Sequence, residues 1–315
     1  MGIIFSTAKD IFSGGSFRTL REAREVGRQR RSAIGRGLDP DLYRVHLIRG
    51  KRHFDVKYDL NSCPHEEIKG NYKIKGFLSR GAWGKVFKAK HNKEEGSYAI
   101  KVIPKITNIS NEDKELRVKE KKLHFALVSD FVVALYSAYQ DPVNLYLVME
   151  YAKYGSLDRF ITKPNSLSEN TIKLIAAQLV LGLEFIHGCD VIYRDLKVQN
   201  VLVFSDGYVK IGDFGLSRRY GGRAHSLVGT PDNMAPEMAD SENGYGLEVD
   251  FWALGILLYR LAYNMHPFRP DHGAFTEREI LERARTCHLL FPGVEEDGEL
   301  NPTEQFLAGL LRKIL

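Results

Sequence analysis

A nine-residue stretch carries the strongest signal in this chain: Ile192-Tyr193-Arg194-Asp195-Leu196-Lys197-Val198-Gln199-Asn200, followed thirteen residues later by Asp213-Phe214-Gly215. Phosphoryl transfer to a hydroxyl needs a carboxylate to take its proton, a cation for the moving phosphoryl group, and oxygen ligands for metal ions on the phosphates. Asp195 can be the catalytic base, Lys197 the cation, and Asn200 with Asp213 the ligands of Mg²⁺. Each alone could be an ordinary surface residue, but the spaced set predicts transfer of phosphate from ATP.

A glycine-containing segment upstream predicts a site for the phosphates. Ser79-Arg80-Gly81-Ala82-Trp83-Gly84-Lys85-Val86 lies between two predicted strands. Glycines let backbone N–H groups approach phosphate oxygens, although the segment alone could equally be a plain hairpin. Ser79 stands where the G-x-G-x-x-G pattern has its first glycine, so we expect weaker nucleotide affinity rather than its loss.

A lysine one strand later strengthens the prediction that this segment binds phosphates. Tyr98-Ala99-Ile100-Lys101 ends an alternating apolar run, so the amine of Lys101 can project toward the same phosphates. Such a lysine needs an acid to hold it in place, and Glu120, on the predicted helix that follows, is the candidate.

The order of predicted elements indicates the fold class. Short strands rich in β-branched and aromatic residues come first, and helices dominate after Gly155. Strands followed by helices predict an α+β protein with a small β-rich N-lobe and a larger helical C-lobe. Ser168 is expected to cap one buried helix. The predicted strands are Tyr72–Leu78, Lys85–Lys90, Ser97–Ile103, Phe131–Tyr139 and Asn144–Tyr151, and the predicted helices include Glu112–Ala126 and Phe306–Leu315.

Composition restricts the remaining possibilities for the order, the compartment and the domain organisation of the chain. The 315 residues have near-average apolar and charged fractions, which argues against wholesale disorder. Three distant cysteines without metal-ligand spacing fit a reducing compartment. No cleavable signal and no run of 18 apolar residues is found; Phe251–Tyr263 comes nearest.

We expect a basic arm over 1–37, a connector over 38–71 and one folded domain over 72–315.

Taken together, these motifs resemble the eukaryotic protein kinases from Tyr72 to the C-terminus. Tyr193 in place of the usual loop histidine resembles the AGC group, as do Gly229-Thr230-Pro231 and Ala235-Pro236-Glu237. Within that group the chain is most similar to the ribosomal S-six kinase-related branch. The resemblance implies the two-lobed protein-kinase fold, serine/threonine kinase activity with ATP and Mg²⁺, a protein substrate and an upstream activating kinase.

The resemblance also implies roles for further residues. Met149 would be the gatekeeper, and the backbone of Glu150 and Ala152 would bind adenine. Asp250 would brace the catalytic loop. Val86 and Ala99 are expected beside the nucleotide.

By family spacing, Ser226 falls where AGC kinases carry their activating phosphate. A phosphate adds about −1.5 to −2 charges and three acceptor oxygens, and Arg194 and Arg218 are placed to receive it. The alternative is that Ser226 is simply a loop serine.

Two departures from the family pattern qualify the prediction. The acidic residues with which arginine-directed AGC kinases read their substrates are replaced by Ser156, Gln199 and Arg260, so we expect no strong preference for upstream arginine. Asp158 could partly compensate for Ser156. The sequence also ends before the arginine that normally pairs with the glutamate of Ala235-Pro236-Glu237, so Glu237 has no evident partner. Either the sequence is a fragment, an unusual isoform or gene model, or another residue takes the role of that arginine.

The N-terminus suggests a membrane. Met1-Gly2-Ile3-Ile4-Phe5-Ser6 fits the myristoylation pattern at Gly2, and Phe17–Leu38 holds seven arginines against two glutamates. One acyl chain binds membranes only marginally, and a basic segment near an anionic surface is a suitable second signal. We therefore expect a peripheral protein on the cytoplasmic face of a membrane. Nucleic-acid binding is not expected, because interleaved aromatic residues are lacking; a solvated arm without a partner remains the simplest alternative.

The competing function is that of a pseudokinase, a kinase fold that acts as a membrane-tethered scaffold. Ser79 and the missing C-terminal piece favour it. The complete set of catalytic residues argues against it, because a scaffold needs none of them.

Overall fold

The computed structural model describes residues 40–60, 63–65, 68–81, 84–105, 120–162, 167–239, 242–268, 276–286, 289, 291–294 and 299–311. The basic arm, with Gly2 and the arginine-rich window, lies outside these residues. The chain divides into two compact units, Met1–Lys153 and Tyr154–Leu315, and each is described by itself.

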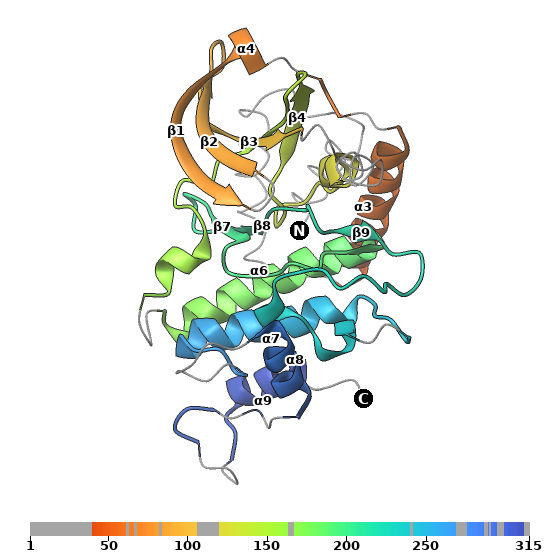
Figure 1. Ribbon diagram of the computed structural model, residues 1–315, viewed down its shortest axis with the longest axis vertical. Helices are drawn as coiled ribbons and strands as arrows, with labels where there is room; N and C mark the ends of the chain where they lie inside the picture. The colour runs from red at the N-terminus through yellow and green to blue at the C-terminus, as the bar shows by residue number, and fades with distance from the viewer. Residues whose placement is uncertain are drawn as a thin grey trace. The chain divides into compact units, whose positions relative to one another are not determined.

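Unit 1 is built on a five-stranded antiparallel sheet with the strand order β1-β2-β3-β5-β4 (Figure 1). The central strand β3 is buried on both faces from Tyr98 to Lys101, which explains its continuous apolar run. Unit 2, which follows, is mainly helical, so the α+β fold class is confirmed. The strands of unit 1 are β1 (Tyr72–Gly81), β2 (Gly84–His91), β3 (Tyr98–Pro104), β4 (Leu135–Gln140) and β5 (Asn144–Glu150).

Two segments of unit 1 differ from the sequence prediction. The strand expected from Phe131 begins only at Leu135, because Ser129 starts a turn: its carbonyl accepts from Val132 N at 3.3 Å and its hydroxyl from Phe131 N at 3.3 Å. The predicted connector contains a 21-residue helix, α3 (Pro40–Leu60), and a short helical segment, α4 (Ile68–Asn71). Of the predicted helix Glu112–Ala126, the described part, 120–126, is helical.

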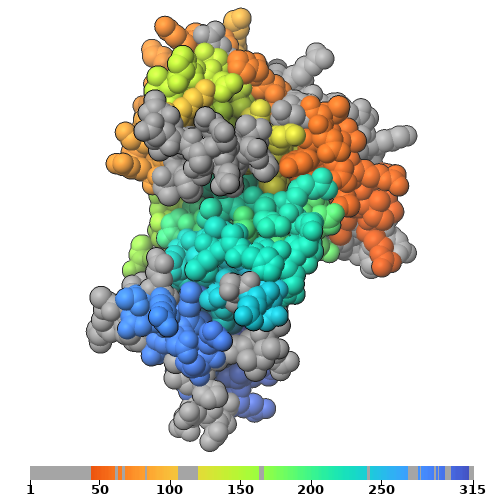
Figure 2. Space-filling view, turned by 45° about the vertical axis from the view of Figure 1, so that its right-hand side comes forward, coloured from red at the N-terminus to blue at the C-terminus, as the bar shows by residue number. Residues whose placement is uncertain are grey.

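The core of unit 1 forms on both faces of the sheet. Ile100 and Val148 belong to one cluster, whereas Ile103, Leu147 and Phe125 belong to another. Phe125 comes from the helix 120–126, so that helix is anchored to the sheet. Helix α3 contributes Phe54, which is fully buried, and Figure 2 shows α3 in orange at the surface.

Unit 2 is organised around two long helices, α6 (Glu169–Gly188) and α7 (Glu248–Tyr263). Ser168 caps α6 as predicted, accepting a hydrogen bond from Thr171 N at 3.2 Å. Helix α9 (Pro302–Leu310) starts four residues before the predicted Phe306, because Asn301 and Glu304 form a capping box. The other elements are η1 (Leu157–Phe160), β6 (Val191–Ile192), β7 (Val201–Val203), β8 (Val209–Ile211), β9 (Arg218–Arg219), η2 (Pro231–Asn233), η3 (Pro236–Ala239) and α8 (Glu277–Thr286).

Helix α6 is the one described helix whose length and hydropathy would suffice to cross a membrane. Its apolar stripe nevertheless belongs to the core of unit 2: Leu179, Leu183 and Ile186 are at most 1% exposed. A core helix passes the same test, so this feature alone does not indicate a membrane span.

Candidate functional site

In unit 1 the predicted phosphate lysine and its acid form a buried ion pair. Lys101 Nζ lies 3.1 Å from Glu120 Oε1, and each side chain is 8% exposed. Lys101 is held by β3, whereas Glu120 belongs to the helix 120–126. The pair therefore depends on the position of that helix against the sheet.

The glycine segment is the end of a hairpin between β1 and β2. Gly81 and Gly84 face each other across the two strands, and Ser79 pairs with Val86. A Cβ on Gly84 would come within 2.2 Å of Val102 O on β3, whereas one on Gly81 would meet nothing closer than 4.0 Å. Packing against β3 thus requires glycine at position 84 whether or not a phosphate binds there. At position 81 no such contact requires glycine, so the close approach of a phosphate, which the sequence suggested for both glycines, remains a possible reason for it.

The predicted adenine residues lie at and just after the end of β5. Met149 is the cross-strand partner of Ala99 and packs against the cluster that contains Phe125. The N–H of Glu150 donates to Ala134 O at 2.9 Å and is not available to a ligand. Within the described residues the backbone of Ala152 makes no hydrogen bond, so both its donor and its acceptor could serve adenine.

In unit 2 the predicted base, Asp195, accepts hydrogen bonds from three side chains. Lys197 Nζ lies 2.8 Å from its Oδ2, Asn200 Nδ2 donates to Oδ2 at 2.8 Å, and Thr230 Oγ1 donates to Oδ1 at 2.8 Å. Lys197 also donates to Thr230 Oγ1 at 2.7 Å. The carboxylate of Asp195, a residue that is 9% exposed, is therefore held in one orientation, as a proton acceptor requires.

The segment that carries this base is fixed by Asp250, which is fully buried on α7. Its carboxylate accepts from Tyr193 N at 2.9 Å, from Arg194 N at 2.7 Å and from His187 Nε2 at 2.7 Å. These three hydrogen bonds provide the bracing of the catalytic loop that the resemblance implied for Asp250. Arg194 has a φ of 69°, a left-handed conformation that a non-glycine residue keeps only when its surroundings enforce it.

Tyr193 connects the same segment to the metal-ligand candidate Asp213. Its ring is fully buried and packs edge-on against Phe214 at 5.3 Å between centroids, and its hydroxyl donates to Gly212 O. Burial, with smaller contributions from Asp195 and Asp213, raises the pKa of the Tyr193 phenol well above its ordinary value. Tyr193 is therefore a neutral donor at any physiological pH.

The residues expected to hold Mg²⁺ fit that ion chemically. Asn200 directs its NH₂ group to Asp195, which turns its amide oxygen to the opposite edge, and Asp213 offers a carboxylate. Mg²⁺ prefers oxygen ligands and takes only one or two of them from protein when phosphates and water supply the rest. No described group of three or more His, Cys, Asp and Glu residues could hold a metal ion, so no rival site is seen there.

The predicted phosphosite residues lie together. Arg194 Nη1 donates to Ser226 Oγ at 2.9 Å and to Tyr245 OH at 3.2 Å, and Tyr245 OH donates to Ser226 O at 2.6 Å. Burial lowers the pKa of the Arg194 guanidinium, and the nearby positive charge of Arg218 acts in the same direction. Ser226 itself is exposed. An exposed hydroxyl beside the Arg194 cation is a suitable acceptor for a phosphate.

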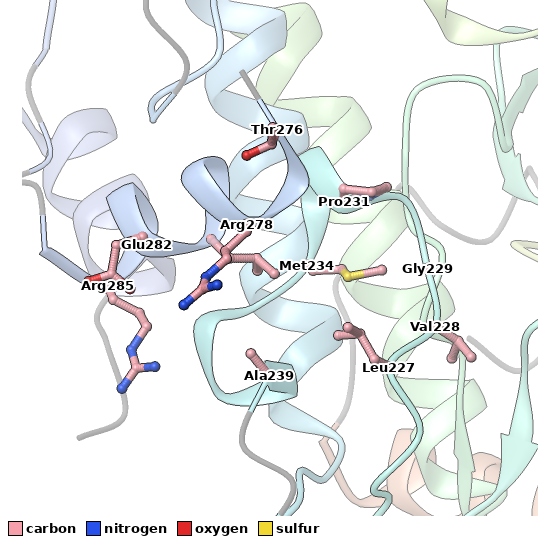
Figure 3. A pocket seen from close by; sticks show the side chains of 11 residues that line it. Leu227, Val228, Gly229, Pro231, Met234, Ala239, Thr276, Arg278, Glu282 and Arg285 are labelled. Atoms are coloured by element: carbon pink, nitrogen blue, oxygen red, sulfur yellow. The ribbon is translucent and has the colours of Figure 1, made fainter. Parts of the chain in front are cut away.

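A pocket of about 760 Å³ opens next to the catalytic segment (Figure 3). Residues 227–239 form its mainly apolar wall, and α8 contributes Leu281 and three charged side chains, those of Arg278, Glu282 and Arg285. Gly229 and Pro231, which line it, flank the Thr230 that donates to Asp195. The lining residues are Leu227, Val228, Gly229, Pro231, Met234, Ala239, Thr276, Arg278, Leu281, Glu282 and Arg285.

Three residues of this arrangement received no role from the sequence: Thr230, Tyr245 and His187. Thr230 belongs to the motif Gly229-Thr230-Pro231, on which the resemblance partly rests, so the sequence contained a signal that could have pointed to it. His187 and Tyr245 had none, because their partners lie 63 and 51 residues away along the chain.

Two other sequence predictions concern carboxylates. Asp158 is partly buried, and its Oδ1, which is itself buried, makes no hydrogen bond among the described residues. Burial raises the pKa of Glu237, with Glu248 adding to the effect and Arg223 opposing it. Within the described residues no side-chain partner of Glu237 is found.

Comparison with known proteins matches the protein kinase domain to residues 72–315. The cAMP-dependent protein kinase catalytic subunit of Dictyostelium discoideum is 38% identical over 68% of this chain and 33% of its own length. Protein kinase C of Drosophila melanogaster is 36% identical over 68% and 29%, and human ribosomal protein S6 kinase alpha-4 is 33% identical over 74% and 32%.

These relatives are AGC serine/threonine kinases, and no single subfamily stands out. The chain spans about a third of the length of each. The domain match covers more than half of the chain and agrees with its α+β fold. This chain therefore belongs to the protein kinase family.

Proposed function

We propose that this chain is a serine/threonine kinase of the AGC group that transfers the γ-phosphate of ATP to protein hydroxyls. The observation that carries the proposal is the network on Asp195, where Lys197, Asn200 and Thr230 converge on one carboxylate. A scaffold would need no such convergence of charged and polar groups. A position within the ribosomal S-six kinase-related branch is supported only by the sequence resemblance.

In the proposed mechanism each unit contributes part of the chemistry. Asp195 orients the substrate hydroxyl and accepts its proton, while Lys197 and Thr230 keep the carboxylate aligned. Lys101, held by Glu120, binds phosphate oxygens of ATP. Asn200 and Asp213 would hold Mg²⁺, which when bound neutralises charge on the phosphates.

The test is phosphate transfer from ATP to a generic protein substrate, with Asp195→Asn as the matched variant. Removing a general base lowers the rate about 10²–10⁴-fold, so the variant should be almost inactive. Activity that survives the substitution would point to a contaminating kinase. An inactive wild type that binds ATP would favour the pseudokinase alternative.

We further propose that Ser226 is phosphorylated by an upstream kinase and that this raises activity. The contacts of Arg194 with the Ser226 hydroxyl support the proposal, because a phosphate there would gain charge-assisted hydrogen bonds.

For the substrate, we propose an apolar residue beside the target hydroxyl and no strong requirement for upstream arginine. The apolar wall of the pocket at 227–239 supports the first part, and the absence of acid at Ser156, Gln199 and Arg260 supports the second. Asp158 is the carboxylate that could restore an arginine preference, although its unbonded oxygen Oδ1 is buried. Phosphorylation of a peptide array tests this proposal, and a dominant preference for upstream arginine would contradict it. Repeating the array with Asp158→Asn would then show whether Asp158 causes that preference.

Membrane attachment through a myristoylated Gly2 and the arginine-rich window remains a proposal from the sequence. It is tested by flotation of the co-translationally myristoylated chain with vesicles that contain phosphatidylserine. Gly2→Ala should abolish binding, and raised salt should weaken it because the basic window is screened. Binding that persists in Gly2→Ala would refute the lipid anchor.

A further inference from the structure

Helix α3 lies outside the residues matched by the kinase family, 72–315, yet it packs into unit 1. Its inner face carries Phe54, Lys57 and Tyr58, which lie three and four positions apart and so share one side of the helix. Phe54 is fully buried and stacks on Tyr58 at 5.6 Å between ring centroids. The opposite face, with Arg52 and Val56, is exposed.

The inner face meets the helix 120–126 through two reciprocal cation–ring contacts. Lys57 Nζ of α3 lies 4.5 Å from the centre of the Phe125 ring. Lys122 Nζ, from the other helix, lies 5.1 Å from the centre of the Tyr58 ring. Each helix supplies one cation and one aromatic ring, and in Figure 1 the two helices lie side by side.

The side chains of Lys57, Tyr58 and Lys122 are half-buried. Burial lowers the pKa of Lys57, and burial with the charge of Lys57 lowers the pKa of His53 to about 4, so His53 is neutral. Cation–π attraction is stronger when the cation has lost water. The two contacts therefore tie the helix 120–126 to α3 at two points.

The constrained helix is the one that carries Glu120. One residue of helical rise is about 1.5 Å, so a shift of that size would break the 3.1 Å contact between Glu120 and Lys101. Phe125 packs in the sheet core and its ring also lies under Lys57 of α3, whereas Lys122, three residues earlier on the same face, contacts Tyr58. The contacts of α3 and the Lys101–Glu120 pair thus favour the same helix position.

We propose that α3 is a positioning element for ATP use, in which Lys57 and Tyr58 keep Glu120 in contact with Lys101. The proposal rests on the proposed function, because the ion pair matters only where Lys101 binds phosphate. Lys57 and Tyr58 act through Glu120 and contact no substrate themselves.

The test compares inner-face variants with outer-face controls in purified full-length chain. Lys57→Met and Tyr58→Ala should each raise the KM for ATP, and the Kd for ATP by calorimetry, about 5- to 10-fold, within the usual range of coupling between sites. Lys57→Arg and Tyr58→Phe keep the cation and the ring and should stay within about 2-fold of wild type. Arg52→Met and Val56→Ala should leave both constants unchanged.

A double-mutant cycle separates positioning from simple stabilisation. In a Glu120→Gln background, Lys57→Met should have little further effect on ATP affinity, because the pair it supports is already lost. A lowered Tm with unchanged ATP constants, or an effect that is fully additive with Glu120→Gln, would overturn the proposal. If the wild type binds ATP but transfers no phosphate, the proposed function fails, and the Kd cycle still decides the role of α3.

Discussion

The two units hold their functional groups in different ways. In unit 1 the key contact is one ion pair between β3 and the helix 120–126, with 3.1 Å between its atoms. In unit 2 Asp195 and Asp250 each accept hydrogen bonds from three donor residues. A carboxylate that accepts from several donors keeps its place when one bond is lost, whereas an ion pair between a strand and a helix depends on the position of that whole helix. We therefore expect changes in unit 2 to affect stability and activity together, and changes in unit 1 to affect activity first.

The largest effect is expected for Asp250→Asn. An asparagine amide offers one acceptor oxygen and one donor NH₂ where three donors converge, so at least one buried N–H loses its partner. We expect a loss of about 3 kcal/mol in the free energy of unfolding and a kcat at least about 100-fold lower. Urea unfolding and steady-state kinetics measure both, with the exposed Glu299→Gln as control. A variant as stable as wild type would show that Asp250 does not hold this segment.

The next effect is expected for Glu120→Gln. The amide keeps the shape but loses the charge, so Lys101 is no longer fixed by an ionic partner. We expect kcat/KM for ATP to fall about 10- to 100-fold, with a smaller loss of stability than in Asp250→Asn. The control is Glu95→Gln, an exposed carboxylate of the same unit. Equal loss of stability in the Glu120 and Asp250 variants would remove the contrast between the units.

A smaller effect is expected at Ser226. Phosphorylation should raise kcat about 10-fold, since one or two charge-assisted hydrogen bonds to Arg194 and Arg218 would order residues 216–230. Ser226→Ala should keep only the basal rate and lose the response to an activating kinase. The exposed Ser205→Ala is the matched control. Activity that ignores both the phosphate and the substitution would make Ser226 an ordinary loop residue.

The smallest effect concerns Glu237, whose pKa is raised by burial. A raised folded-state pKa means that the folded chain binds the proton more tightly than the unfolded chain, so Glu237 lowers stability as pH rises above its ordinary range of about 4–5. Glu237→Gln should raise Tm by on the order of 1 °C at pH 8, and the gain should shrink toward pH 5. Thermal unfolding at several pH values tests this. A lower Tm at pH 8 would instead mean that the ionised carboxylate stabilises the fold.

Local sequence was enough to predict most of the chemistry. Asp195, Lys197 and Asn200 lie within one hydrogen-bonded loop, so their spacing along the chain nearly sets their spacing in space. The Ser168 cap and the order of strands before helices were predictable for the same reason, because each depends on neighbours in the chain.

Tertiary structure alone decided the contacts between distant residues. The hydroxyl of Thr230 meets Asp195 across 35 residues, and His187 meets Asp250 across 63. The need for glycine at position 84 comes from Val102 on another strand, and α3 owes its place to Phe54 and its contacts with the helix 120–126. The sequence thus specified which groups perform the chemistry, because residue type and short spacing suffice for that. What holds those groups in position depends on packing between segments far apart in the chain, which no local pattern encodes.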